Sequence, residues 1–202
     1  MTKKRGTPLL LAAAIGFGAL ASVAQAGQAF MHTGGRTTQP IGHYEFCQRE
    51  PEECRQKTAR QAPVELSRKL WAAMVDINDR VNVTVTPRTD LEMWGKEELW
   101  SYPTNVGDCE DYALEKRRRL MKLGVPAGDL LLTVVRQRNG DGHAVLTMRT
   151  SRGEFILDNL EPRILAWSDT SYSYLKRQSE RNSGAWVAID DSRPAVSVGS
   201  VQ

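Results

Sequence analysis

The chain has 202 residues, of which 41% are hydrophobic and 25% are charged. This composition excludes a disordered protein and favours one folded domain with a real core. The net charge is +3, but residues 27–202 hold equal numbers of basic and acidic side chains, because the excess lies in Lys3, Lys4 and Arg5. The basic balance therefore gives no support for nucleic-acid binding, and we expect no nucleic-acid partner.

Residues 1–26 have the pattern of a secretory signal peptide. The basic residues are followed by an apolar run from Leu9 to Leu20 and by Ala24-Gln25-Ala26, which is typical of a cleavage site. The run is too short to span a bilayer comfortably, and no second hydrophobic segment follows it. We expect cleavage after Ala26, a periplasmic or secreted location, and a processed protein that is not an integral membrane protein. An uncleaved membrane anchor is the alternative.

The number and spacing of the cysteines indicate which of them has a free thiol. Cys47, Cys54 and Cys109 make an odd number, which in an oxidising compartment implies an intermolecular bridge or one free thiol. The short spacing of Cys47 and Cys54, with Pro51 favouring a turn between them, predicts a small disulfide loop. Two reduced thiols are the alternative. The bridge would leave Cys109 unpaired, as a nucleophile requires.

Residues 27–62 are predicted to form an extended N-terminal arm that carries this disulfide loop. The first part, residues 27–42, is rich in Gly, Thr and Gln and has no apolar period. His32 and His43 lie on either side of it, and we expect both side chains to be solvated.

Residues 63–190 are predicted to form the folded domain, which begins with a core helix. Apolar residues recur at three- and four-residue steps, and Pro63 suits the first turn; the residues of this stripe are Leu66, Leu70, Met74, Ile77 and Val81. Residues 81–86 are expected to form a short strand or an extended exit. Residues 89–100 are expected to form a loop with a helical turn.

A second helix is predicted over residues 108–123, with Gly124 and Pro126 as its stop. Its cluster of basic residues is interpreted as a solvated face; the residues are Lys116, Arg117, Arg118 and Lys122. Just before this helix, Trp94, Trp100 and Tyr102 could either wall a substrate cleft or cap the core.

Three strands follow, over residues 130–135, 144–149 and 154–158. The turn residues between them, at 139–142 and 151–153, predict antiparallel hairpins. Residues 185–189 are expected to add a last strand, and residues 191–202 to form a flexible tail. The predicted fold class is therefore α+β, with a helix packed against an antiparallel sheet.

Three residues in this arrangement suggest nucleophilic catalysis. Cys109 lies at a predicted helix start, where the dipole favours a thiolate, although the neighbouring acids oppose it. His143 opens the second strand of the hairpin and Asp158 ends the third, so the two should lie side by side. A thiolate–imidazolium pair with a carboxylate that orients the imidazole is a cysteine-hydrolase triad.

The local motifs carry the argument further. Gly-Asp-Cys-Glu-Asp-Tyr-Ala (107–113), Gly-His-Ala-Val-Leu (142–146) and Phe-Ile-Leu-Asp-Asn (155–159) resemble those of the bacterial transglutaminase-like cysteine proteinases. Residues 33–47 and 167–170 share the resemblance, which covers nearly the whole mature chain. It implies a papain-like, transglutaminase-like core with Cys109 as nucleophile, His143 as general base and acid, and Asp158 as the residue that orients His143.

The same resemblance implies further partners. Members of this family include periplasmic, calcium-dependent proteases that cleave large surface adhesins and are controlled by an inner-membrane cyclic-di-GMP receptor. Asp108, Glu110 and Asp111 place three hard oxygen ligands within four residues, which suits Ca²⁺. A bound cation would also offset their repulsion of a Cys109 thiolate. Ordinary acids at a helix N-terminus are the alternative.

Two other functions compete with hydrolysis. A transglutaminase or amidase would use the same triad, and a transglutaminase would pass the acyl group to an amine instead of water. A non-catalytic periplasmic binding module could keep the fold without activity. The joint presence of Cys109, His143 and Asp158 disfavours the binding module, and the absence of any marked amine site favours hydrolysis.

Overall fold

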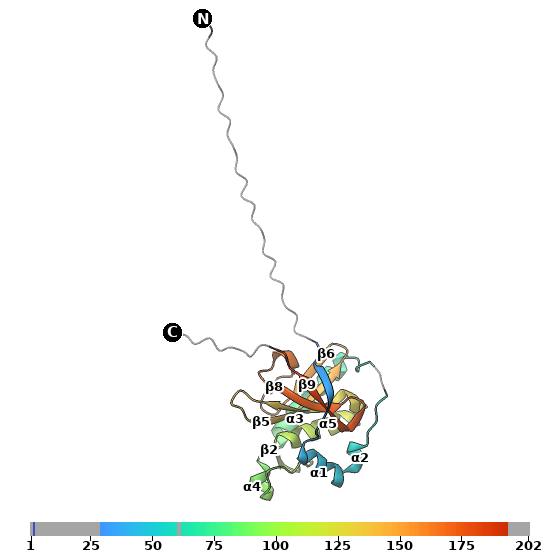
Figure 1. Cartoon of the computed structure of the whole chain (residues 1–202), viewed down its shortest axis with the longest axis vertical. Helices are drawn as coiled ribbons and strands as arrows, with labels where there is room; N and C mark the ends of the chain where they lie inside the picture. The colour runs from blue at the N-terminus through green and yellow to red at the C-terminus, as the bar shows by residue number, and fades with distance from the viewer. Residues whose placement is uncertain (1, 3–28, 60–61, 194–202) are drawn as a thin grey trace.

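The computed structural model describes residue 2, residues 29–59 and residues 62–193 (Figure 1). The predicted signal peptide therefore lies, except for residue 2, outside the described residues. Within the described residues, no helix combines the length and the apolar character that a bilayer crossing needs.

Seven strands form one sheet in the order β1-β9-β8-β4-β5-β6-β7, and every neighbouring pair is antiparallel. The strands are β1 (His32–Thr37), β4 (Leu130–Arg136), β5 (Gly142–Thr150), β6 (Gly153–Leu157), β7 (Leu165–Ala166), β8 (Ser173–Ser179) and β9 (Asn182–Asp190). Two short strands, β2 (Thr86–Pro87) and β3 (Val106–Gly107), form a separate parallel pair.

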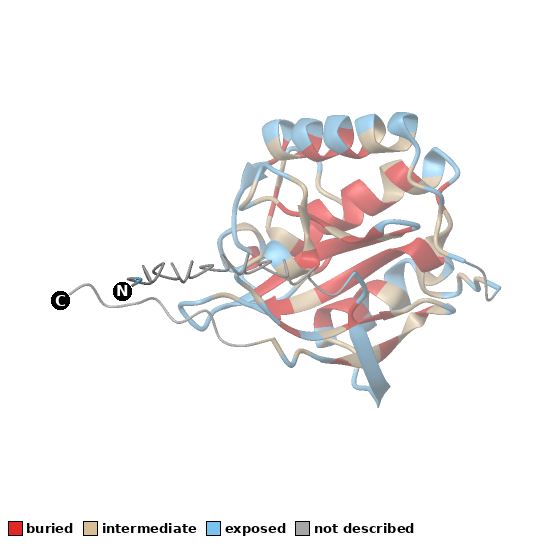
Figure 2. Cartoon of the chain, turned by 90° about the horizontal axis from the view of Figure 1, so that it is seen from above, coloured by how far each residue is buried: buried red, intermediate tan, exposed pale blue. Residues whose placement is uncertain are grey.

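Two long helices stack in layers on one face of this sheet. The α-helices of the described residues are α1 (Ile41–Arg49), α2 (Pro51–Cys54), α3 (Arg68–Thr84), α4 (Asp90–Trp94) and α5 (Cys109–Lys122), and the 3-10 helices are η1 (Ala127–Asp129) and η2 (Trp167–Asp169). Helix α5 lies against β4 and β5, and α3 packs on α5. Figure 2 shows the resulting layers: an outer helix with an exposed face, a buried helix, and the buried centre of the sheet.

Helix α5 has charged residues and a stop signal that favour a helix at this place in the sequence. Its acids Glu110 and Asp111 lie in the first turn and its cations Arg119 and Lys122 in the last turn, as the helix dipole favours. Gly124 follows with φ +91°, a left-handed conformation that suits glycine and ends the helix. The predicted helix over residues 108–123 is confirmed.

The predicted boundaries of the first helix are wrong at both ends. Helix α3 begins at Arg68 because the Ser67 side chain accepts a hydrogen bond from the Leu70 N–H at 3.1 Å; the preceding residues are extended, and Val64 bridges to the sheet at Thr150. At the other end the helix continues to Thr84, which replaces most of the strand predicted over residues 81–86. Burial of Val81 in the core outweighs its β-propensity.

The predicted antiparallel hairpins are confirmed as β4–β5 and β5–β6, and the predicted last strand is part of β9. Strands β1, β7 and β8 were not predicted. Within the predicted tail, the guanidinium of Arg193 bonds the Asp191 carboxylate and the backbone oxygen of Trp167. Residues 194–202 lie outside the described residues.

The predicted exposure of His43 is wrong. His43 lies on α1, is only 1% exposed, and accepts a hydrogen bond at Nδ1 from the indole N–H of Trp186 at 3.2 Å. Its ring also contacts the Cys47–Cys54 disulfide, which the structure contains as predicted. Burial and the positive charge of Arg117 lower the pKa of His43 from 6.5 to about 3, so the ring is neutral at physiological pH.

We predict that His43 makes the fold sensitive to acid. The unfolded chain takes up a proton on His43 below pH 6.5, whereas the folded chain does so only near pH 3. The free energy of unfolding should therefore fall with decreasing pH over this window, by up to about 1.4 kcal/mol per pH unit. Urea unfolding between pH 6 and 4 should show a shallower slope for His43→Gln than for the wild type.

His32→Gln is the matched control, since His32 lies on β1 with an exposed side chain, and it should keep the wild-type slope. Parallel slopes for the wild type and His43→Gln would contradict the prediction.

Candidate active site

Cys109 is the first residue of α5, and Asp108 alone separates it from β3. Since Cys47 and Cys54 are bonded to each other, Cys109 is the free cysteine of the described chain. The backbone N–H of Ala144 on β5 lies near the Cys109 sulfur and lowers the pKa of the thiol. The packing of α5 on β5 thus holds the thiol beside the residue that follows His143.

His143 and Asp158 form a buried pair. The distance from His143 Nε2 to Asp158 Oδ1 is 2.8 Å, and the two side chains are 3% and 2% exposed. Burial by itself would raise the pKa of Asp158, but hydrogen bonds and charge from His143, with hydrogen bonds from Tyr172 and Leu160, hold it below its usual value. Because Asp158 engages Nε2, the other ring nitrogen of His143 is left for a different partner.

The electrostatic surroundings of Cys109 oppose a thiolate. Burial raises the pKa of the Cys109 thiol, and Glu110 raises it further through its charge and a hydrogen bond. The thiol donates this hydrogen bond to Glu110 Oε2 at 3.1 Å. The Ala144 N–H acts in the opposite direction, while Asp108 adds to the rise.

A cluster of carboxylates lies next to the thiol. Asp90 at the start of α4, Asp108 and Glu110 each place one oxygen so that all three lie within 4.8 Å of one another. Burial and mutual repulsion raise the pKa of Asp108 to about 6 and that of Glu110 to about 9. Oδ1 of Asp90 and Oδ1 of Asp108 are buried without a hydrogen-bond partner. Such a donor set fits a hard divalent cation.

This cluster differs from the set expected from sequence. The structure brings Asp108 and Glu110 together, but the third acid is Asp90 and not Asp111. Asp111 Oδ1 instead accepts a hydrogen bond from the Ser101 N–H at 2.7 Å, and its Oδ2 is buried without a partner. Asp90 lies eighteen residues before Asp108, and only the fold brings them together, through a hydrogen bond from the Asp90 N–H to Asp108 Oδ2 at 3.3 Å.

The sequence left open whether the aromatic residues before α5 wall a substrate cleft or cap the core, and the structure places them differently. Trp100 is 3% exposed and belongs to the core, and Tyr102 packs against that core. Trp94 is 56% exposed. Of these three, Trp94 is the one whose side chain is exposed.

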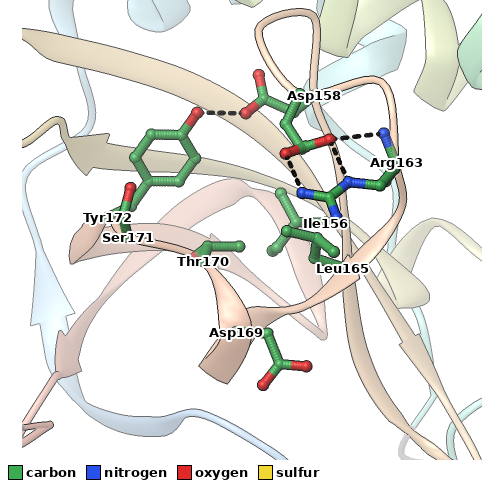
Figure 3. A pocket seen from close by; sticks show the side chains of 9 residues that line it. Ile156, Asp158, Arg163, Leu165, Asp169, Thr170, Ser171 and Tyr172 are labelled. Carbon is green, nitrogen blue, oxygen red and sulfur yellow. Dashed lines mark hydrogen bonds and ion pairs between the residues drawn. The ribbon is translucent and has the colours of Figure 1, made fainter.

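A pocket of about 170 Å³ opens beside the His143–Asp158 pair (Figure 3). Its wall includes Asp158 and Tyr172, and the Tyr172 hydroxyl donates a short hydrogen bond to Asp158 Oδ2. Farther out, the guanidinium of Arg163 forms two hydrogen bonds with the Glu161 carboxylate, at 2.9 and 2.8 Å. No sequence motif marks Tyr172, which lies in the loop between η2 and β8.

The chain matches the family model of the bacterial transglutaminase-like cysteine proteinases over residues 33–194. The chain belongs to this family. It is thus a transglutaminase-like cysteine peptidase, and the matched range includes Cys109, His143 and Asp158. No curated protein sequence matches the chain.

Solved structures share this fold. LapG of Legionella pneumophila is 23% identical, with a TM-score of 0.50 over 75% of this chain and 82% of that one. Its calcium-bound form is 22% identical, with a TM-score of 0.51 over 80% and 88% of the two chains, and an EGTA-treated form is also similar, with 23% identity, 77% and 84% coverage and a TM-score of 0.50. At this identity the similarity shows that the fold is shared.

The basic face predicted for α5 is wrong for two of its residues. Arg117 is 1% exposed and bonds Glu53 at 2.8 Å. Lys116 is 0% exposed, and its Nζ has no hydrogen-bond partner. Burial lowers the pKa of Lys116 to about 7, against the opposing charges of Asp158 and Asp79.

We predict that Lys116→Met stabilises the protein at pH 7, by about 1 kcal/mol or more, because it removes a buried amine that has no hydrogen-bond partner. The unfolded chain keeps the Lys116 proton up to pH 10.5, whereas the folded chain loses it near pH 7. Wild-type stability should therefore recover with rising pH, and the advantage of the variant should shrink by about 1 kcal/mol per pH unit from pH 7 to 9. Urea unfolding at both pH values measures this.

Lys122→Met changes an exposed lysine on the same helix and should show neither effect. A Lys116→Met variant that is less stable than the wild type at pH 7 would disprove the interpretation.

Proposed function

We propose that this peptidase is exported to the periplasm and cleaves a protein substrate with Cys109, His143 and Asp158 as its catalytic triad. The observation that carries the proposal is the junction of α5 and β5. There the backbone N–H of Ala144 lies beside the Cys109 thiol and lowers its pKa, while the neighbouring His143 is bound to Asp158 at 2.8 Å. Export is supported by the pattern of residues 1–26.

The proposed reaction is acyl transfer to water. His143 takes the thiol proton, and the Cys109 sulfur attacks the peptide carbonyl carbon to form a tetrahedral oxyanion. His143 then gives the proton to the leaving amine as the C–N bond breaks. Water, deprotonated by His143, cleaves the thioester and releases the acid. The Cys109 backbone N–H at the helix start is a suitable donor to the oxyanion, and Asp158 keeps the imidazole oriented.

Calcium fits the acid cluster in this proposal. Asp90, Asp108 and Glu110 would hold the ion, with Asp111 as a neighbouring acid. A bound divalent cation would supply positive charge that offsets the repulsion between these carboxylates and a Cys109 thiolate. The calcium-bound and EGTA-treated forms of LapG are consistent with a calcium site in this family.

The substrate and regulator are proposed from the family resemblance alone. A large surface adhesin is the proposed substrate, and an inner-membrane cyclic-di-GMP receptor is the proposed regulator. Transfer of the acyl group to an amine would need the same triad, so only the product distinguishes a transglutaminase from a hydrolase.

We predict that Cys109→Ala abolishes proteolysis, with a loss of at least about 10³-fold, because the nucleophile is absent. Comparison of the surface and periplasmic proteins of wild-type and Cys109→Ala cells should reveal new protein N-termini only in the wild type. Unchanged circular dichroism would show that the variant is folded. Cleavage that persists in Cys109→Ala would remove the nucleophile assignment, and amine-linked products instead of new termini would indicate transamidation.

We also predict that Ca²⁺ raises the melting temperature of the purified protein and that EGTA reverses this. Binding to the folded state alone stabilises by about 2.7 kcal/mol at a hundred times the dissociation constant. Asp108→Asn should remove the response. Asp141→Asn, which changes an exposed acid in the β4–β5 turn, should keep it. A melting temperature that Ca²⁺ leaves unchanged in the wild type would remove the calcium proposal.

A further inference from the structure

Asp158 is held through both of its oxygens. Oδ1 accepts hydrogen bonds from His143 Nε2 at 2.8 Å and from the Leu160 N–H at 3.0 Å. Oδ2 accepts the short hydrogen bond from the Tyr172 hydroxyl, which Figure 3 shows as a dashed line. Without Tyr172, Oδ2 would lose the donor that fixes the rotation of the carboxylate about its last bond.

Tyr172 also contacts His143 directly. The centroids of the two rings are 5.5 Å apart, and the ring planes are tilted by 52°. One side chain therefore contacts both members of the His143–Asp158 pair, by a hydrogen bond to the acid and by ring packing on the imidazole. Tyr172 also lines the pocket, together with Asp158.

The protein holds Tyr172 in place from the end of β9. Nη2 of Arg193 donates to the Tyr172 backbone oxygen, and Nη1 donates to the Trp167 backbone oxygen at 3.0 Å. Arg193 is itself fixed by two hydrogen bonds to Asp191, at 2.7 and 2.8 Å. Asp191 also accepts the Tyr174 N–H at 2.9 Å. The loop that carries Tyr172 is therefore anchored on both sides of that residue.

The hydroxyl of Tyr172 acts as a donor at all relevant pH values. Burial, the hydrogen bond to Asp158 and the negative charge of Asp158 all raise the pKa of Tyr172. The proton thus stays on the tyrosine, and Asp158 stays an acceptor for both Tyr172 and His143.

We propose that Tyr172 is a positioning residue of the reaction, which fixes Asp158 and covers His143 so that the imidazole faces Cys109 in one orientation. The proposal rests on the proposed function. A hydrogen bond to a charged group of this kind corresponds to about a 10-fold to 100-fold effect on a rate.

The test compares Tyr172→Phe with Tyr174→Phe. The first keeps the ring and removes only the hydroxyl that bonds Asp158. The second removes a hydroxyl two residues away that bonds Thr170 at 2.9 Å and does not touch the pair. Tyr172 is only half-buried, so Tyr172→Phe should keep the fold, which its melting temperature will verify.

Two rates are measured in the presence of Ca²⁺. The first is the alkylation of Cys109 by iodoacetamide, located by mass spectrometry, which needs no substrate. The second is cleavage of a fluorogenic peptide that carries a site mapped from the new N-termini. Tyr172→Phe should slow alkylation about 10-fold and lower kcat about 10-fold to 100-fold with little change in KM. Tyr174→Phe should change neither.

The outcomes separate the two proposals. Alkylation of Tyr172→Phe at the wild-type rate, or equal losses in Tyr172→Phe and Tyr174→Phe, would overturn the role of Tyr172. Slower alkylation in Tyr172→Phe alone supports that role even if the wild type shows no cleavage that depends on Cys109, in which case the proposed function fails.

Discussion

The packing of α5 against β5 is the constraint on which the candidate active site depends. Leu114 and Leu120 are at most 1% exposed, and each buried leucine contributes about 1.5–3 kcal/mol. These contacts fix the rotation and height of the helix, and so the position of its first residue, Cys109, next to Ala144. A slip of one turn would move the thiol by about 5.4 Å, away from Ala144. The core therefore sets the geometry of the site.

This arrangement is electrostatically unfavourable for a thiolate. The start of α5 brings three carboxylates and a thiol into a poorly solvated space, so burial and repulsion raise the pKa of the Cys109 thiol and of Glu110. The dipole of the helix favours negative charge there but is small beside this repulsion. The His143–Asp158 pair, by contrast, is already joined by a hydrogen bond of 2.8 Å. Activation of Cys109 therefore depends more on a positive charge that offsets these carboxylates than on the formation of the His143–Asp158 pair.

The sequence predicted those parts of the site that local signals specify. The helix start at Cys109 follows from helix patterning, and the adjacency of His143 and Asp158 follows from hairpin turns. Asp90 and Tyr172 could not be found in this way, since each reaches the site only through tertiary packing. His43 and Lys116 were misjudged for a related reason: polarity predicts exposure only on average, and here Trp186 bonds the first while the core surrounds the second. The C-terminal edge of α3 was missed because the burial of Val81 outweighed its β-propensity, and the N-terminal edge because the Ser67 side chain caps the helix at Arg68.

The disulfide-bonded helices α1 and α2 support the acid cluster from a distance. A side chain at Gly42 would approach Trp100 Cδ1 to 2.4 Å, so only glycine lets α1 pack against this indole. Arg49 donates to the Trp100 backbone oxygen at 2.7 Å. The residues on either side of Trp100 then donate their backbone N–H groups to the acids, Leu99 to Asp90 and Ser101 to Asp111. The segment that holds these carboxylates is thus fixed on its far side by α1. Because the Cys47–Cys54 bridge limits how α1 and α2 can separate, the N-terminal helices are part of the structure that positions the acids beside Cys109.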